Sequence, residues 1–194
     1  MEKLIAFLNL IATSEGWPLS PECLEWLRTT IETIEIRKGD YLLRPGQICR
    51  NLYFIESGLL KCFYIHKGKS VIDWFFGEQE TVVSLDSFYD QIPSEDFIQP
   101  IENCVLHYIS YEQLNFAYRN FVEFNVLGRV LTNKYLRIWH RQARNIRMLT
   151  AEERFLSLMR TQPELFNRAD VQDIASFLGM SRETLSRARK DFLK

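Results

Sequence analysis

The stretch from Asp170 to Phe192 decides the fold, and it reads DVQDIASFLGMSRETLSRARKDF. Apolar residues recur in it at helical spacing on both sides of a short break. They are Ile174, Ala175 and Leu178 before the break, and Leu185 and Phe192 after it. Because Gly179-Met180-Ser181 interrupts the pattern, the stretch predicts a helix, a three-residue turn and a second helix.

Polar residues stand where these two helices should begin. The carboxylate of Asp170 can accept a hydrogen bond from a free amide of the first helix, and Ser181 can do the same for the second. Asp173 adds negative charge near the positive end of the first helix. We therefore expect the helices to start just after 170 and 181.

The outer face of the second helix carries side chains suited to DNA. Arg182 and Arg187 can each donate two parallel hydrogen bonds to guanine, and Glu183 can accept one from the cytosine amino group. Further polar residues suit phosphate contact and positioning. They are Gln172, Ser181, Thr184, Ser186, Arg189 and Lys190. The alternative interpretation is a solvated charged face that closes a small helical domain.

The run Ser181-Arg182-Glu183-Thr184-Leu185-Ser186-Arg187, preceded by Gln172-Asp173-Ile174-Ala175 and Leu178-Gly179, resembles the DNA-binding motif of the Crp/Fnr transcription regulators. The resemblance implies a homodimeric bacterial regulator in which Arg182, Glu183 and Arg187 contact the bases of each half-site. It also implies three partners: double-stranded DNA, a second copy of the chain and RNA polymerase.

Composition is consistent with a DNA-facing C-terminal end. The chain has 194 residues and a net charge of −1, yet residues 137–194 contain 12 Lys and Arg against 7 Asp and Glu. The apolar start at 4–12 follows Glu2 and precedes Glu15, so we interpret it as an amphipathic helix of a cytoplasmic protein rather than a signal peptide. Nothing reaches the apolar length of a membrane span.

From Thr33 the apolar period changes to two and turn glycines become frequent. Many short strands so closely spaced predict a small antiparallel barrel or roll. The expected strands are 33–36, 41–43, 52–55, 59–66, 70–76, 81–85 and 103–109. Helices that only pack are expected over 1–32.

Three segments of this region resemble the cyclic-nucleotide-binding β-roll of the same family: Lys38–Leu42, Pro45–Gln47 and Leu52–Gly58. Binding members hold the phosphate with an Arg-Ser pair that follows a Gly-Glu turn. Here Ser94 and Glu95 stand at the pair, and Val83-Ser84 stand at the turn. Since Glu95 and Asp96 would repel a phosphate, we expect no cyclic AMP binding of the usual kind and leave the effector open.

Cysteine and histidine give no sign of a metal or haem. Four cysteines and three histidines are scattered without the spacing of metal ligands, so neither haem nor iron–sulfur ligation is indicated. An enzyme built on the roll would need clustered His and Glu ligands, and the sequence offers none. The remaining alternative to a DNA reader is a small-ligand sensor that acts through protein contacts.

A helical period returns near Glu112, and apolar residues then recur over Asn120–Arg147 on a stripe too wide for one partner. This predicts a long helix that packs on the roll and on a second copy of the chain, the alternative being a core helix of a single chain. The family resemblance places Tyr135, Trp139 and His140 of this helix beside any effector pocket, with Val83, Ser84, Ser94 and Glu95.

The sequence as a whole predicts an α+β protein. An N-terminal antiparallel β-roll with its helices is expected over 1–119, a long dimerisation helix over 120–148 and a winged-helix-like or helix-turn-helix domain over 149–194. Thr150-Ala151-Glu152-Glu153 has the pattern of a capping box, which places the hinge near 148–150. The short segment 161–170 leaves little room for a wing, so we expect a reduced one.

Overall fold

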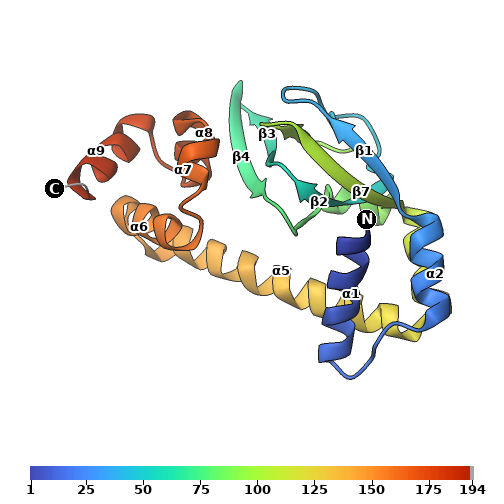
Figure 1. Ribbon diagram of the computed structural model, residues 1–194. Coiled ribbons are helices and arrows are strands. Elements are labelled where there is room, and N and C mark those ends of the chain that lie inside the picture. Colours follow the sequence, from blue (N-terminus) through green and yellow to red (C-terminus); the bar gives the residue numbers. More distant parts are fainter. Residues whose placement is uncertain (193–194) are drawn as a thin grey trace.

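The computed structural model describes residues 1–192, so the last two residues of the expected DNA-binding domain lie outside the described part. A β-roll with helices along one side forms one end of the molecule, and a small bundle of helices forms the other (Figure 1). One long helix, α5, passes beneath the roll and joins the two ends. The predicted α+β architecture of roll, long helix and helical C-terminal domain is confirmed.

The helices of the described residues follow the expected order, and α3, α4 and α7 are additional to it. In chain order the helices are α1 (Glu2–Ser14), α2 (Pro21–Thr30), α3 (Leu85–Asp90), α4 (Tyr111–Asn120), α5 (Val122–Met148), α6 (Ala151–Thr161), α7 (Leu165–Arg168), α8 (Val171–Phe177) and α9 (Arg182–Phe192). Helix α2 starts at Pro21, and its first turn is capped by Ser20, whose hydroxyl accepts from the amide of Cys23 at 3.2 Å.

Two antiparallel sheets form the roll. One has the order β1-β7-β2-β5 and the other β4-β3-β6. The strands are β1 (Glu32–Ile36), β2 (Asn51–Ser57), β3 (Leu60–His66), β4 (Lys69–Phe76), β5 (Thr81–Val82), β6 (Phe97–Pro100) and β7 (Cys104–Ser110). Their inward residues, among them Ile55, Leu60, Ile98 and Leu106, are fully buried and make the core between the sheets.

Three details of the predicted roll are wrong. Residues 41–43 form no strand, because only Leu43 makes an isolated bridge, to Ile98. The strand expected over 81–85 ends at Val82, and Leu85 already opens α3. Strand β6 was not expected at all, since Pro100 and the acidic residues before it hide its pattern of alternating burial.

The long helix begins two residues later than predicted. Helix α4 follows a capping box at Ser110 and ends at Asn120, and the extended backbone of Phe121 turns the chain before α5. On α5 one face is buried against the rest of the chain through Phe124 and Leu127, while Leu136 and Ile146 on another face are 61% and 52% exposed.

The C-terminal helices share their own core. Phe155 of α6, Ile174 of α8 and Leu185 of α9 are buried together. The predicted capping box at Thr150 is present, because its hydroxyl accepts from the amide of Glu153 and the Glu153 carboxylate accepts from the amide of Thr150. Residues 167–169 were expected to be a link, but 165–168 form the short helix α7. All elements described after Met148 are helices, which leaves no wing within 149–192.

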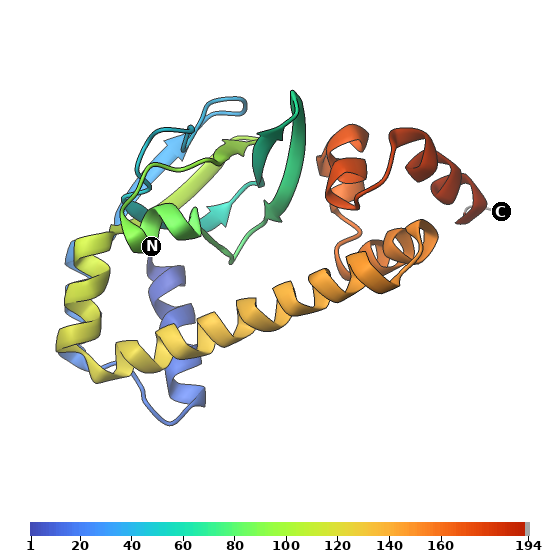
Figure 2. The ribbon, with the colours of Figure 1, turned by 180° about the vertical axis from the view of Figure 1, so that it is seen from behind.

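The helical domain does not stand free of the roll. Helix α8 lies beside strand β4 in both views (Figures 1 and 2), and contacts between these two elements are numerous. The α8–β4 contact therefore fixes how the helix-turn-helix sits on the roll.

Candidate nucleic-acid interface

The turn between α8 and α9 has the expected geometry. Gly179 adopts φ of +62°, a left-handed conformation that suits glycine, and the amide of Met180 donates to the carbonyl of Ala175 at 3.0 Å. Ser181 caps α9 as predicted, because its hydroxyl accepts from the amide of Thr184 at 3.1 Å. Asp170 holds the N-cap position of α8 but makes no side-chain capping hydrogen bond.

Arg154 of α6 supports this turn from below. Its guanidinium donates to the carbonyls of Leu178 at 2.8 Å and Leu149 at 2.7 Å. One side chain thus ties the end of α8 to the start of the domain. No local sequence pattern predicts this role of Arg154, because both acceptors are backbone carbonyls.

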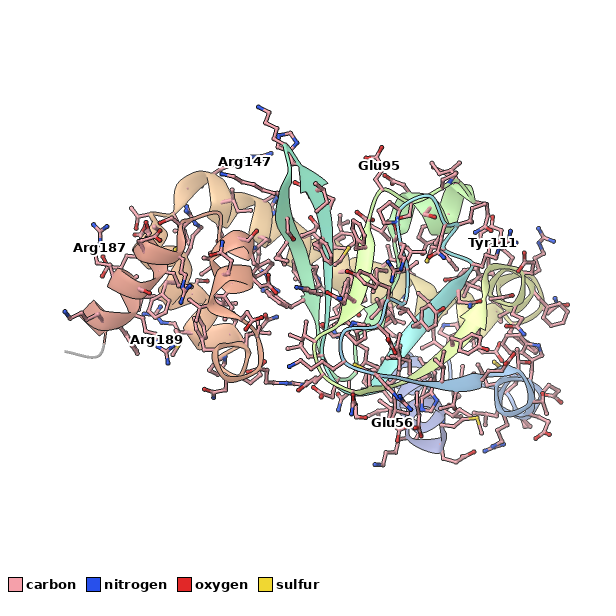
Figure 3. The ribbon with its side chains drawn as sticks, turned by 90° about the horizontal axis from the view of Figure 1, so that it is seen from above. Glu56, Glu95, Tyr111, Arg147, Arg187 and Arg189 are labelled. Carbon is pink, nitrogen blue, oxygen red and sulfur yellow. The ribbon has the colours of Figure 1, made fainter. Side chains whose placement is uncertain are left out.

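Helix α9 separates a buried face from a polar one. Leu185 and Ala188 are 2% and 8% exposed and pack on the domain core. The three predicted base-reading residues, Arg182, Glu183 and Arg187, are all exposed. In Figure 3 the labelled Arg187 lies on the helical end of the molecule, away from the roll. The geometry therefore leaves the predicted reading side chains accessible.

The charge of Glu183 is favoured by its position at the start of α9. Hydrogen bonding to its own backbone amide and to Ser181, together with the neighbouring Arg182, lowers the pKa of the Glu183 carboxyl. An ionised carboxylate accepts hydrogen bonds and donates none. Glu183 therefore presents an acceptor, the group that a cytosine amino group requires.

The predicted phosphate-contacting residues fall into two groups. Gln172, Ser186, Arg189 and Lys190 are exposed on α8 and α9. Ser181 and Thr184 are engaged with each other, because their hydroxyl oxygens lie 3.1 Å apart while Ser181 caps the helix. The first group can approach a polyanion directly, and the second group orders the start of α9.

An ion pair joins the helix-turn-helix to the roll. Lys61 of β3 donates to the carboxylate of Asp173 on α8 at 2.7 Å, and both side chains are largely buried. Close by, the hydroxyl of Ser176 accepts from the backbone amide of Ile72 in β4 at 3.0 Å. Asp173 was expected only to favour the start of α8 by its charge. Its partner lies 112 residues away, which no local pattern could reveal.

A second ionic contact also joins the helical domain to the roll. Arg168 of α7 donates to both oxygens of Glu78, at 3.0 and 2.7 Å, and also to Glu102. This contact lowers the pKa of the Glu78 carboxyl from 4.5 to about 2. Two carboxylates of the roll thus hold one arginine of the helical domain.

Aromatic side chains also pack across this interface. The ring of Phe177 on α8 meets Trp74 and Phe75 of β4 edge-on, with centroids 5.7 and 5.4 Å apart. The indole nitrogen of Trp74 is buried without a hydrogen-bond partner among residues 1–192. Aromatic rings of β4 therefore form part of the surface on which the helix-turn-helix packs.

The residues expected to stand at a nucleotide phosphate present hydroxyls and a carboxylate. Ser84 and Ser94 are buried with their oxygens 3.0 Å apart, and Ser84 donates to Asp96 at 2.6 Å. No cationic side chain is hydrogen-bonded to these three within the described chain. Glu95 instead points to the outside (Figure 3). A carboxylate with no cation does not fit a phosphate, so these residues do not suit a cyclic nucleotide.

The other predicted pocket residues do not all meet. Val83, Tyr135 and Trp139 line an apolar cleft of about 480 Å³ between the roll and α5. The hydroxyl of Tyr135 accepts from the amide of Thr81 at 2.7 Å. His140 is exposed and is not among the residues that line this cleft.

The described residues offer neither a metal cluster nor a membrane-spanning helix. Over 1–192, no three His, Cys, Asp or Glu side chains gather in a way that could hold a metal ion. Nor does any described helix have the length and apolar character needed to cross a membrane.

Comparison with protein families gives one match. Residues 33–120 match the family model of the cyclic nucleotide-binding domain. This segment runs from β1 to the end of α4. No curated protein sequence matches the chain.

Solved structures match over most of the chain. FixK2 from Bradyrhizobium japonicum aligns with a TM-score of 0.71 at 17% identity, over 84% of each chain. The c-di-GMP-responsive global regulator CLP of Xanthomonas campestris aligns with a TM-score of 0.65 at 22% identity, over 88% of this chain and 90% of that one. A Eubacterium rectale protein described as a transcriptional regulator of the Crp/Fnr family gives a TM-score of 0.70 at 16% identity, over 90% and 84%. The chain therefore has the fold of the Crp/Fnr-type regulators, and residues 33–120 within it match the cyclic nucleotide-binding domain model.

Proposed function

We propose that the protein is a sequence-specific, DNA-binding transcription regulator of the Crp/Fnr type. One observation carries the proposal: α9 buries Leu185 and Ala188 and leaves Arg182, Glu183 and Arg187 exposed at its N-terminal half. A helix that packs on its domain with one face and exposes Arg and Glu on the other has the chemistry for reading base edges in a major groove.

We further propose that the working form is a homodimer. Leu136, Trp139, Ala143 and Ile146 of α5 follow one another at steps of three, four and three, the spacing of a coiled-coil seam. Leu136, Trp139 and Ile146 are 61%, 36% and 52% exposed in the single chain. A second copy would bury this seam and bring two α9 helices to one DNA duplex.

The domain boundaries follow from this account. Residues 1–119 form the effector-type domain, 120–148 the dimerisation helix and 149–194 the DNA-binding domain. We expect DNA binding without cyclic AMP, because Asp96 stands where a phosphate would have to bind. RNA polymerase is a further proposed partner, and the proposed DNA target places the protein in the cytoplasm.

The test is selection of bound duplexes from a random DNA pool at near-physiological salt. Wild type, Arg182→Ala and Arg187→Ala are compared with Arg119→Ala, an exposed arginine of α4 on the roll side. Wild type and Arg119→Ala should enrich the same two-fold symmetric site. Each reading variant should lose about 1–3 kcal/mol and relax the preference at one base pair per half-site.

Two outcomes would argue against base reading by α9. If both reading variants enrich the same sequence as wild type with the same affinity, another part of the chain reads the DNA. If nothing is enriched and any DNA binding ignores salt, the alternative of a sensor acting through protein contacts gains support, because phosphate contacts impose a steep salt dependence.

A further inference from the structure

Two apolar spaces lie side by side between α5 and the sheet that contains β2 and β5. The outer one is the cleft of about 480 Å³, and the inner one is a cavity of about 90 Å³ that reaches toward α1 and α2. They share five lining residues: Leu52, Thr81, Tyr118, Gly128 and Leu131. Since both spaces use the same wall, one molecule could extend from the cleft into the cavity.

The lining of these spaces is mainly apolar. No Asp, Glu, Lys or Arg lines either of them, although one residue in four of the whole chain is charged. The histidine of the inner cavity, His107, already has a hydrogen-bond partner in Glu56. The buried trio of Ser84, Ser94 and Asp96 lines neither space. The cleft is therefore separate from the residues expected at a nucleotide phosphate. A charged ligand would bind poorly in it, because the charge would lose its water without gaining a partner.

Two tyrosine hydroxyls supply the polar chemistry. The hydroxyl of Tyr118 has no hydrogen-bond partner among residues 1–192, and that of Tyr135 accepts from Thr81, which leaves its own proton free to donate. Burial raises the pKa of both phenols, that of Tyr118 to about 12, so both stay protonated at neutral pH. An apolar lining with a small number of polar groups is the usual make-up of a small-molecule site.

Gly128 makes room at the junction of the two spaces. It lies inside α5, where glycine weakens a helix, and a Cβ added to it would meet the hydroxyl of Tyr118 at 2.7 Å. The ring of Tyr118 therefore lies directly across the helix backbone. This placement puts its hydroxyl where both spaces meet.

We infer that the cleft and the cavity form one binding site for an uncharged, apolar small molecule that carries a hydrogen-bond acceptor. The acceptor would face Tyr118 and Tyr135, and the apolar body would lie along Leu52 and Leu131. This inference goes beyond the proposed reading of DNA, and its test needs no DNA. A second copy of α5 is the competing occupant of the outer cleft, because Leu136 and Trp139 at its edge also belong to the proposed seam.

The test measures binding of Prodan, an uncharged naphthyl ketone whose fluorescence rises when it leaves water, to the full chain. Methyl naphthyl ketone and naphthoate, which have the same rings but differ in charge, are the competitors. Tyr118→Phe removes the unpartnered donor, and Tyr64→Phe on the exposed side of β3 is its matched control. Leu131→Trp fills the shared wall, and Thr132→Trp blocks the mouth from an exposed position in case the first variant fails to fold.

The inference predicts that the ketone displaces Prodan at least roughly tenfold better than naphthoate. Tyr118→Phe should weaken ketone binding roughly three- to tenfold, while Tyr64→Phe leaves it unchanged. Either tryptophan variant should abolish binding. Three results would each overturn the inference. Naphthoate could compete as well as the ketone, or both folded tryptophan variants could bind Prodan like wild type. Binding could also be lost as the protein dimerises with rising concentration, which would assign the cleft to a second copy.

Discussion

Lys61 of β3 and Asp173 of α8 form an ion pair at 2.7 Å, with only 16% and 15% of their side chains exposed. This pair joins the predicted effector domain to the first helix of the helix-turn-helix. Ser176 binds the backbone of β4 beside it, and Phe177 packs on Trp74 and Phe75. The reading helix α9 is therefore held relative to the roll through α8 as well as through α5.

Removing one member of this pair should destabilise the protein. Lys61→Gln or Asp173→Asn leaves the other charge largely buried and without its partner. We expect this to lower the free energy of unfolding by about 1–3 kcal/mol. The double variant should cost less than the sum of the two. Urea unfolding measures all three.

The exposed pair Arg129 and Glu15 is the matched control, with 59% and 39% of the side chains exposed at a separation of 3.0 Å. Arg129→Gln should cost no more than about 1 kcal/mol, because water screens such pairs. If Lys61→Gln proves as mild as Arg129→Gln, the pair does not hold the two domains together.

Acid should weaken the contact of Arg168 with the roll. The pKa of Glu78 falls from 4.5 to about 2 in the folded chain, so its ionised form stabilises the fold fully above pH 4.5. That contribution is lost as the pH falls from 4.5 toward 2, since folded and unfolded chains then bind the same proton. The difference in urea midpoint between wild type and Glu78→Gln should therefore shrink over this range. A constant difference from pH 7 to pH 2.5 would contradict the pairing.

Replacing Gly58, in the turn between β2 and β3, should strongly destabilise the protein. It adopts φ of +106°, and a Cβ there would lie 2.4 Å from the sulfur of Cys104 and 2.8 Å from the carbonyl of Asn103. Gly68 in the β3–β4 turn also has a positive φ, +74°, but has open space around it. Gly68→Ala should cost about 1–2 kcal/mol, the penalty of the left-handed backbone, and Gly58→Ala clearly more. Equal losses of stability would refute the steric argument.

Cyclic AMP should not stabilise the protein. A ligand that binds only the folded state raises the melting temperature, and the trio of Ser84, Ser94 and Asp96 offers a phosphate no cation. We expect the same melting temperature with and without millimolar cyclic AMP. A rise that depends on nucleotide concentration would mean that another cation reaches the phosphate.

Local patterns in the sequence were enough for the elements with their own start and stop signals. The capping residues Thr150 and Ser181 and the break at Gly179 all lie where the pattern placed them. Strand β6 and helix α3 were missed because each is short and draws its order from partners elsewhere, β6 from β3 and α3 from its buried Phe88. Short elements of this kind are specified by packing rather than by local propensity.

The contacts between the domains could not be predicted from the sequence. Arg168 and Glu78 are 90 residues apart, and Lys61 and Asp173 are 112 apart, so each residue alone looks like an ordinary surface charge. The effector residues were placed by resemblance, and the structure groups them differently: Ser84 and Ser94 bind each other, while Val83, Tyr135 and Trp139 line the cleft. The base-reading role of Arg182, Glu183 and Arg187 stays a prediction.

The decisive experiment measures affinity for DNA as a function of half-site spacing, without any nucleotide. A dimer of this kind should read two half-sites about 34 Å apart, one turn of DNA. Inserting about five base pairs between the half-sites of the enriched site turns one of them to the opposite face of the duplex. The account predicts a loss of roughly a hundredfold, down to the affinity for one half-site. Unchanged affinity after the insertion, or no binding to the unaltered site without nucleotide, would contradict it.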